Sequence, residues 1–137
     1  MRKFLRTVVA VAAAGLVIVA ASAAGSYRGV EPVVVAGSPS CKDIAGLSYS
    51  AEVKFAEPVN GSNLDGIYLL LDQTGISWYT LLNENVRAVI VKGGPNANVY
   101  RYPGGDFSDG LIVPPRNPKN GKLYGLGYVT VCYDPPA

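Results

Sequence analysis

Short alternating segments, each closed by a turn, constrain the fold of this chain more than any other feature. Residues 49–55 alternate between apolar or aromatic and polar side chains, which is the pattern of a half-buried strand. Short apolar runs at 66–71, 86–91 and 124–133 are bounded by turn residues such as Gly, Pro, Asn and Asp. No sustained helical stripe follows the N-terminal segment. The pattern predicts an all-β fold, an antiparallel β-sandwich or a partly open barrel.

The intervening segments refine this prediction. Residues Ile76–Leu82 have Trp and Leu at helical spacing, yet their Ile, Trp, Tyr and Thr content favours a strand, so both remain open. The strongly apolar run Val86–Val91 is expected at the centre of a sheet. The Gly- and Asn-rich segment Gly93–Asn98 predicts a turn that leads back into Val99–Tyr102. Three prolines in Pro114–Gly121 predict a loop, because proline lacks the amide donor that a helix or central strand needs.

The N-terminal segment has the pattern of an export signal. Three basic residues fall within positions 1–6, an almost wholly apolar stretch follows at 7–20, and Ala21-Ser22-Ala23 supplies the small residues of a cleavage site. These features predict a helical signal peptide over 1–23, cleaved near Ala23. An uncleaved membrane anchor is the alternative, because the 18 residues 7–24 just reach the length needed to span a bilayer.

The remainder reads as a single domain. Residues 24–40 are predicted to form a flexible lead-in, within which Val33–Val35 could add one edge strand. Residues 41–134 are predicted to form the β-sandwich domain.

Charge and composition exclude several functions. The chain has 12 Lys and Arg residues against 10 Asp and Glu residues, and three of the basic ones lie in the predicted signal. Its removal would leave a formal charge of about −1, which argues against a nucleic-acid partner. No membrane partner is expected once the signal is removed. The complete lack of His removes the commonest general base and metal ligand.

The two cysteines are predicted to pair. Cys41 and Cys132 lie near the two ends of the predicted domain, and an even number of cysteines in an exported protein favours a disulfide. The bond would join the terminal strands. A catalytic thiol is the alternative, but the chain offers no His to activate it.

Two carboxylates are candidates for chemistry. Asp106 and Asp109 lie three residues apart in a predicted Gly-rich loop, and a pair of carboxylates can hydrolyse a glycosidic bond. They are also the weak candidates for a Ca²⁺ site, which needs several oxygen ligands. The third interpretation is that each Asp accepts hydrogen bonds from its own backbone in a turn.

The tyrosines suggest a binding surface. The chain has nine Tyr but three Phe and one Trp. Tyr100 and Tyr102 share one strand face and Tyr124 and Tyr128 lie in the last predicted strand, so an exposed aromatic platform for a sugar or protein is one hypothesis. The alternative is that these rings pack in the core, since Tyr is a good strand residue.

The Pro-rich loop gives a third hypothesis. Residues Pro114–Pro118 would form a stiff loop that presents Arg116, and a stiff loop loses little entropy when it binds a protease as an inhibitor.

Part of the chain resembles a known pattern. The pieces that carry it are the sequences V-I-V-K-G-G, N-V-Y-R-Y, D-G-L-I-V-P and C-Y, spread over residues 88–133, about a third of the chain. This combination resembles exported and surface-attached bacterial β domains. Where that pattern commonly has a Ser-His pair before the last strand, this chain has Leu126-Gly127-Tyr128. The resemblance implies a secreted β domain, often carried beside cell-surface anchoring signals, and it brings no established activity.

The sequence therefore favours a secreted, non-enzymatic β domain that binds a cell-surface, glycan or protein partner. The alternatives are a small extracellular hydrolase that uses Asp106 or Asp109, and a protease inhibitor that presents the loop Pro114–Pro118.

Overall fold

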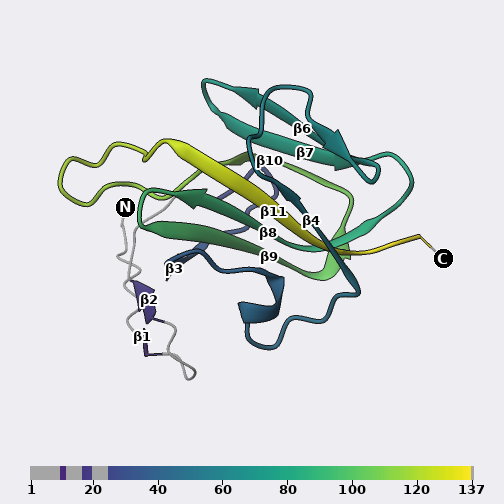
Figure 1. Ribbon diagram of the computed structural model, residues 1–137, viewed down its shortest axis with the longest axis horizontal. Helices are drawn as coiled ribbons and strands as arrows, with labels where there is room; N and C mark the ends of the chain where they lie inside the picture. Colours follow the sequence, from purple (N-terminus) through teal and green to yellow (C-terminus); the bar gives the residue numbers. More distant parts are fainter. Residues whose placement is uncertain (1–9, 12–16, 20–24, 137) are drawn as a thin grey trace.

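Two antiparallel sheets pack face to face in the computed structural model, which describes residues 10–11, 17–19 and 25–136 (Figure 1). The predicted antiparallel β-sandwich is confirmed. The larger sheet has the spatial order β1 (Ala10–Val11), β2 (Val17–Val19), β3 (Val33–Ala36), β9 (Asn96–Asp106), β8 (Asn85–Gly93), β11 (Leu126–Asp134) and β4 (Ala51–Phe55). The smaller sheet has the order β10 (Ser108–Ile112), β7 (Gly75–Thr80), β6 (Ile67–Asp72) and β5 (Asn63–Leu64).

The main core lies between the two sheets. Each strand sends alternate side chains into this space, because the side-chain period of a strand is two residues. Trp78 of β7 is the largest of the fully buried side chains. β8 lies between β9 and β11, as expected for the most apolar run. The buried members of this core are Val53, Phe55, Ile67, Leu69, Ile76, Trp78, Val86, Val89, Val91, Tyr100, Tyr102, Ile112, Val129, Val131 and Tyr133.

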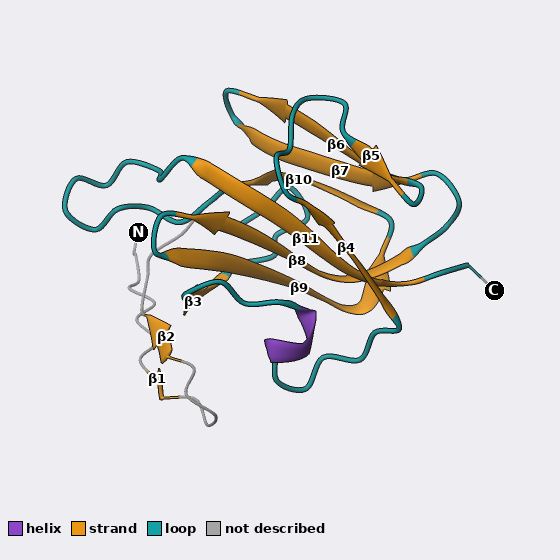
Figure 2. Ribbon diagram, in the orientation of Figure 1, coloured by secondary structure: helices purple, strands orange, loops and turns teal. Residues whose placement is uncertain are grey.

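A second, smaller core covers the other face of the larger sheet. The short 3-10 helix η2 (Cys41–Asp43) lies on this side, away from the smaller sheet (Figure 2). Cys41 forms a disulfide with Cys132 of β11, with a Cα–Cα distance of 5.8 Å, which confirms the predicted bond. Only Cys132 lies in a strand, since Cys41 belongs to η2. The bond fastens the segment after β3 onto the sheet.

The N-terminal part of the chain differs from the expectation. Val33–Ala36 forms β3, so the strand that Val33–Val35 could add to the lead-in 24–40 is present, but it lies between β2 and β9 rather than at an edge. Most of the predicted signal peptide, 1–23, lies outside the described residues. The two described pieces of it are β1 and β2, strands rather than helix, and β2 pairs with β3. Their valines and isoleucine favour extended backbone.

Two hairpins and the passage of the chain from one sheet to the other position the side chains of the candidate site. The β6–β7 hairpin turns at Gln73–Thr74. The ambiguous segment Ile76–Leu82 is a strand as far as Thr80, where β7 ends, and Leu81 and Leu82 lie outside the strand. The β8–β9 hairpin turns at Gly94–Pro95 as predicted. The chain then leaves the larger sheet at Phe107 and enters the smaller one as β10.

Candidate functional site

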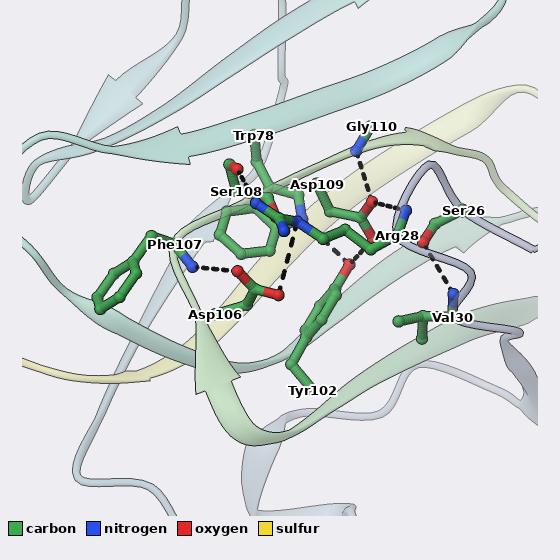
Figure 3. A network of polar contacts seen from close by, with 10 residues as sticks. All are labelled: Ser26, Arg28, Val30, Trp78, Tyr102, Asp106, Phe107, Ser108, Asp109 and Gly110. Carbon is green, nitrogen blue, oxygen red and sulfur yellow. Dashed lines mark hydrogen bonds and ion pairs between the residues drawn. The ribbon is translucent and has the colours of Figure 1, made fainter.

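A hydrogen-bond network surrounds Asp109 where the chain crosses between the sheets (Figure 3). Asp109 lies on β10 with its side chain in the core, opposite Trp78 of β7. Its Oδ2 accepts a hydrogen bond of 2.7 Å from the Tyr102 hydroxyl, which in turn accepts one of 3.2 Å from Trp78 Nε1. Its Oδ1 accepts hydrogen bonds from the backbone amides of Arg28 and Gly110 at 2.9 and 2.8 Å. Both carboxylate oxygens are therefore engaged by protein donors.

Asp106 has a different setting. Its Oδ2 lies 3.6 Å from Arg28 Nε in a partly exposed ion pair, and its Oδ1 accepts a hydrogen bond from the Phe107 amide. Arg28 also donates Nε and Nη2 hydrogen bonds to the carbonyl and hydroxyl of Ser108, each of 2.9 Å. Asp106 at the end of β9 and Asp109 on β10 thus both hold the segment around Arg28, and they lie in two strands rather than in the one loop that was predicted.

This arrangement gives the acid pair a structural role. Asp109 is buried, and its carboxylate oxygens accept three hydrogen bonds. Asp106 forms an ion pair with Arg28. The two acids therefore do not present a shared pair of free carboxylates. Within residues 25–136, no three His, Cys, Asp or Glu side chains gather closely enough to hold a metal ion. Asp106 and Asp109 do not form the gathered oxygen ligands that Ca²⁺ needs.

The network changes the chemistry of Tyr102. Burial raises the pKa of its hydroxyl well above the ordinary value near 10, because the phenolate would lose its hydration, and the bond to the Asp109 carboxylate raises the pKa further. Burial likewise raises the pKa of Tyr100. Loss of the proton from either hydroxyl is therefore less favourable in the folded protein than in the unfolded chain.

This predicts a loss of stability at alkaline pH. A raised folded-state pKa gives stability that is complete below the unfolded value near 10 and declines as the pH rises above it, by up to about 1.4 kcal/mol per pH unit for Tyr102. Urea unfolding between pH 8 and pH 11 measures this decline. Tyr102→Phe should make the decline shallower, and an unchanged slope in that variant would contradict the prediction.

The hypothesis of an exposed platform at Tyr100 and Tyr102 is wrong. Their exposed fractions are 0% and 3%. The Tyr100 hydroxyl accepts a hydrogen bond from the Val113 amide and donates one to the Val113 carbonyl, while Tyr102 reaches Asp109. These rings face the space between the sheets, where polar partners for their hydroxyls are available. The core alternative is the correct one for this pair.

Tyr124 and Tyr128, the other two tyrosines of the predicted platform, do not lie beside Tyr100 and Tyr102. Tyr128 packs beside the second core and donates a hydrogen bond of 2.9 Å to the Pro39 carbonyl, with Lys54 Nζ 4.3 Å from its ring centre. Tyr124 lies against Gly94 at the β8–β9 turn, so close that a Cβ there would meet its ring at 2.5 Å. Both rings are half-buried and lie apart from the buried Tyr100 and Tyr102.

The Pro-rich loop keeps Arg116 at the surface. Pro114 and Pro115 are buried, whereas Arg116 is exposed and donates Nη1 to the Gly121 carbonyl at 2.8 Å. A single bridge pairs Arg116 with Leu123, so the loop folds back on itself. The protease-inhibitor hypothesis for this loop stays a prediction.

A different aromatic pair lies on the outer face of the smaller sheet. Tyr68 of β6 and Tyr79 of β7 are direct cross-strand partners, and their rings stack with centres 5.2 Å apart at 15°. Alternation places Ile67, Leu69 and Trp78 in the core and turns these two rings outward. Both are half-buried, so part of each ring meets solvent.

Polar and apolar groups surround this pair. Asn63 lies opposite Tyr68 on β5, and Ser108 lies opposite Tyr79 on β10. In the next row, Leu70 is 44% exposed and lies opposite Ser77. We call Tyr68, Tyr79, Leu70 and these polar neighbours the outer face.

Tyr27 extends the outer face beyond β10. It is 78% exposed, and its amide donates a hydrogen bond of 2.8 Å to the Gly110 carbonyl. A Cβ on Gly110 would lie 3.7 Å from the Tyr27 Cβ and 3.1 Å from the Ser77 hydroxyl. The guanidinium of Arg28, the next residue after Tyr27, donates hydrogen bonds to Ser108.

The fold and its sites thus define an all-β, disulfide-bonded antiparallel sandwich with an aromatic outer face. No family model matches the chain, and no significant similarity to a curated protein or a solved structure is found. Over the part of the chain that the structure describes, no helix has the length and apolar character required to cross a membrane.

Proposed function

We propose that this chain is an exported, non-enzymatic β domain that binds a carbohydrate at the cell surface through its outer face. The observation that carries the proposal is the outward stack of Tyr68 on Tyr79. The disulfide and the N-terminal signal pattern support export, because structural disulfides persist in oxidising compartments. The resemblance to exported and surface-attached bacterial domains points the same way.

The chemistry of the outer face favours carbohydrate over protein. Tyrosine rings offer flat apolar faces for the C–H groups of a sugar, and their hydroxyls tolerate water. Amide, hydroxyl and guanidinium groups flank the rings at Asn63, Ser77, Ser108 and Arg28, and sugar hydroxyls can pair with all of them. The centre of a protein interface is apolar, whereas the stacked rings of the outer face have the polar neighbours Asn63 and Ser108 directly beside them.

The proposal that the domain is not an enzyme depends on the contacts of Asp106 and Asp109 and on the lack of histidine. Asp109 is occupied by three donors, and the chain has no His. Asp106 and Asp109 therefore do not offer a free pair of carboxylates for acid and base roles.

Glycan-array and titration measurements test the proposal. The wild-type domain should bind a subset of glycans, and Tyr68→Ala combined with Tyr79→Ala should weaken that binding by at least about tenfold, because both stacking faces are lost. Tyr68→Phe with Tyr79→Phe keeps the rings and should retain most of the affinity.

The matched control is Tyr124→Ala combined with Tyr128→Ala, which removes two half-buried rings away from the outer face. This control should bind like the wild type, once unfolding curves show that each variant is folded. Loss of binding in the control but not in the Tyr68 and Tyr79 variant would refute the assigned face. Binding of a protein but no glycan would refute the ligand class, and hydrolysis of a bound glycan would refute the non-enzymatic role.

A further inference from the structure

A small cavity opens on the side of the larger sheet that carries η2. It has a volume of about 230 Å³ and lies where the segment Gly46–Ser48 approaches the far end of β9. Two guanidinium side chains line it, those of Arg87 on β8 and Arg101 on β9. Its wall contains no acidic side chain from the described part of the chain.

Each of the two guanidinium groups forms a hydrogen bond with a group of the protein that does not line the cavity. Arg101 donates Nη1 to the Ala45 carbonyl at 2.9 Å. Arg87 donates Nε to Asp134 Oδ2 at 2.8 Å, and Asp134 Oδ1 accepts a further hydrogen bond of 2.8 Å from the Ser50 hydroxyl. The Arg87 hydrogen bond is the largest of the causes that lower the pKa of Asp134, so this anchor stays charged at neutral pH.

The anchors leave donors for a ligand. A guanidinium carries five N–H groups, and the hydrogen bonds described for 25–136 engage one on Arg87 and one on Arg101. Ser48 adds a hydroxyl to the wall. Asp134 balances the charge of Arg87, and the ion pairs formed among the described residues leave Arg101 without a carboxylate partner. Among the described residues, the groups at the cavity therefore carry an excess of about one positive charge.

Two glycines contribute backbone without side chains to the lining of the cavity. Gly46 and Gly104 both line the cavity with positive φ, at +72° and +80°, where side chains are disfavoured. A Cβ on Gly46 would lie 3.8 Å from Arg101 Nη2, an ordinary van der Waals contact, so the positive φ is what disfavours a side chain there. The Cys41–Cys132 bond fastens the chain just before this wall to the sheet.

We propose that this cavity binds a singly charged oxyanion group, such as the carboxylate of an acidic sugar or a sulfate ester. Guanidinium groups pair with such groups through parallel hydrogen bonds. The volume suits one small group, since pockets for drug-sized ligands begin near 300 Å³. The site shares no residue with the outer face, and it stands or falls independently of carbohydrate binding there.

Amide NMR titration of the whole protein at constant ionic strength tests this inference. Glucuronate should give saturable shifts at the amides of Gly46, Ser48 and Gly104, with a dissociation constant on the order of 1 mM. Glucose, which lacks the carboxylate, should give none at these positions. Separate titrations with sulfate and with phosphate then show whether the site accepts any oxyanion or requires a carboxylate.

Variants complete the test. Arg101→Gln should weaken glucuronate binding by at least about tenfold, and Arg101→Lys should weaken it less, because it keeps the charge but loses the fork. Arg116→Gln, a matched loss of an exposed guanidinium outside the cavity, should bind like the wild type. If Arg101→Gln does not fold, the proposal is judged by whether the glucuronate shifts of the wild type fall at the amides that line the cavity. Equal shifts at the cavity with glucose, glucuronate shifts that leave the cavity amides unchanged, or no saturable shift with any anion would overturn the proposal.

Discussion

Replacing Cys41 and Cys132 together with alanine should lower the free energy of unfolding by about 4–5 kcal/mol. The bond closes a sequence separation of 91 residues, and in the chain-entropy model a loop of that length restricts the unfolded chain by about this amount. Both cysteines are fully buried in the second core, so the loss also loosens η2 against the sheet. A domain with the usual net stability of about 5–15 kcal/mol would lose a large share of it.

Urea unfolding followed by Trp fluorescence measures this effect. Trp78 is the single Trp of the chain and is 1% exposed, so its emission reports the loss of the main core. Dithiothreitol should destabilise the wild type by a similar amount and leave the double variant unchanged. A difference below about 1 kcal/mol between oxidised and reduced wild type would contradict the entropic argument.

Asp109→Ala should cost about 3 kcal/mol of folding stability. The substitution removes the acceptor of the buried Tyr102 hydroxyl and also strips the Arg28 and Gly110 amides of their partner. A buried donor left without an acceptor costs about 1–3 kcal/mol, and hydrogen bonds to a charged acceptor are stronger than neutral ones. Asp109→Asn keeps an acceptor oxygen and should cost less.

The matched control is Asp106→Ala, three residues earlier. Asp106 is partly exposed, and its ion pair with Arg28 spans 3.6 Å, so its loss should change the free energy of unfolding by about 1 kcal/mol or less. Equal losses in the Asp106 and Asp109 variants would show that burial of the Asp109 carboxylate does not set its contribution.

The strand pattern was predictable because it depends on local alternation. In β11, Val129, Val131 and Tyr133 share the core face, as period two requires. In β4, Val53 and Phe55 do the same. The disulfide was also predictable, since a chain with two cysteines has one internal pairing available.

The outer face was within reach of the sequence but was missed. The run Gly66–Leu71 reads as uniformly apolar, which hides the alternation of Tyr68 with its core-facing neighbours. The turn at Asp72–Gly75 carries the missing signal. A two-residue hairpin turn there fixes the register and sets Tyr68 directly opposite Tyr79.

The buried tyrosines show what local pattern cannot supply. Alternation places Tyr100 and Tyr102 on one face of β9, but it does not say which face meets the second sheet. Their partners, Val113 and Asp109, come from the chain after it has crossed to the smaller sheet. The same holds for the cavity, where β8, β9 and the segment after η2 meet.

The sequence alone determined the all-β class, the positions of most strands and the pairing of Cys41 with Cys132, because these follow from side-chain period, turn residues and cysteine count. The tertiary structure alone decided which tyrosines are buried, what Asp109 contacts and that Arg87 and Arg101 share a cavity. Those features depend on which sheet face is covered and on contacts between residues far apart in the chain, and no local pattern encodes either.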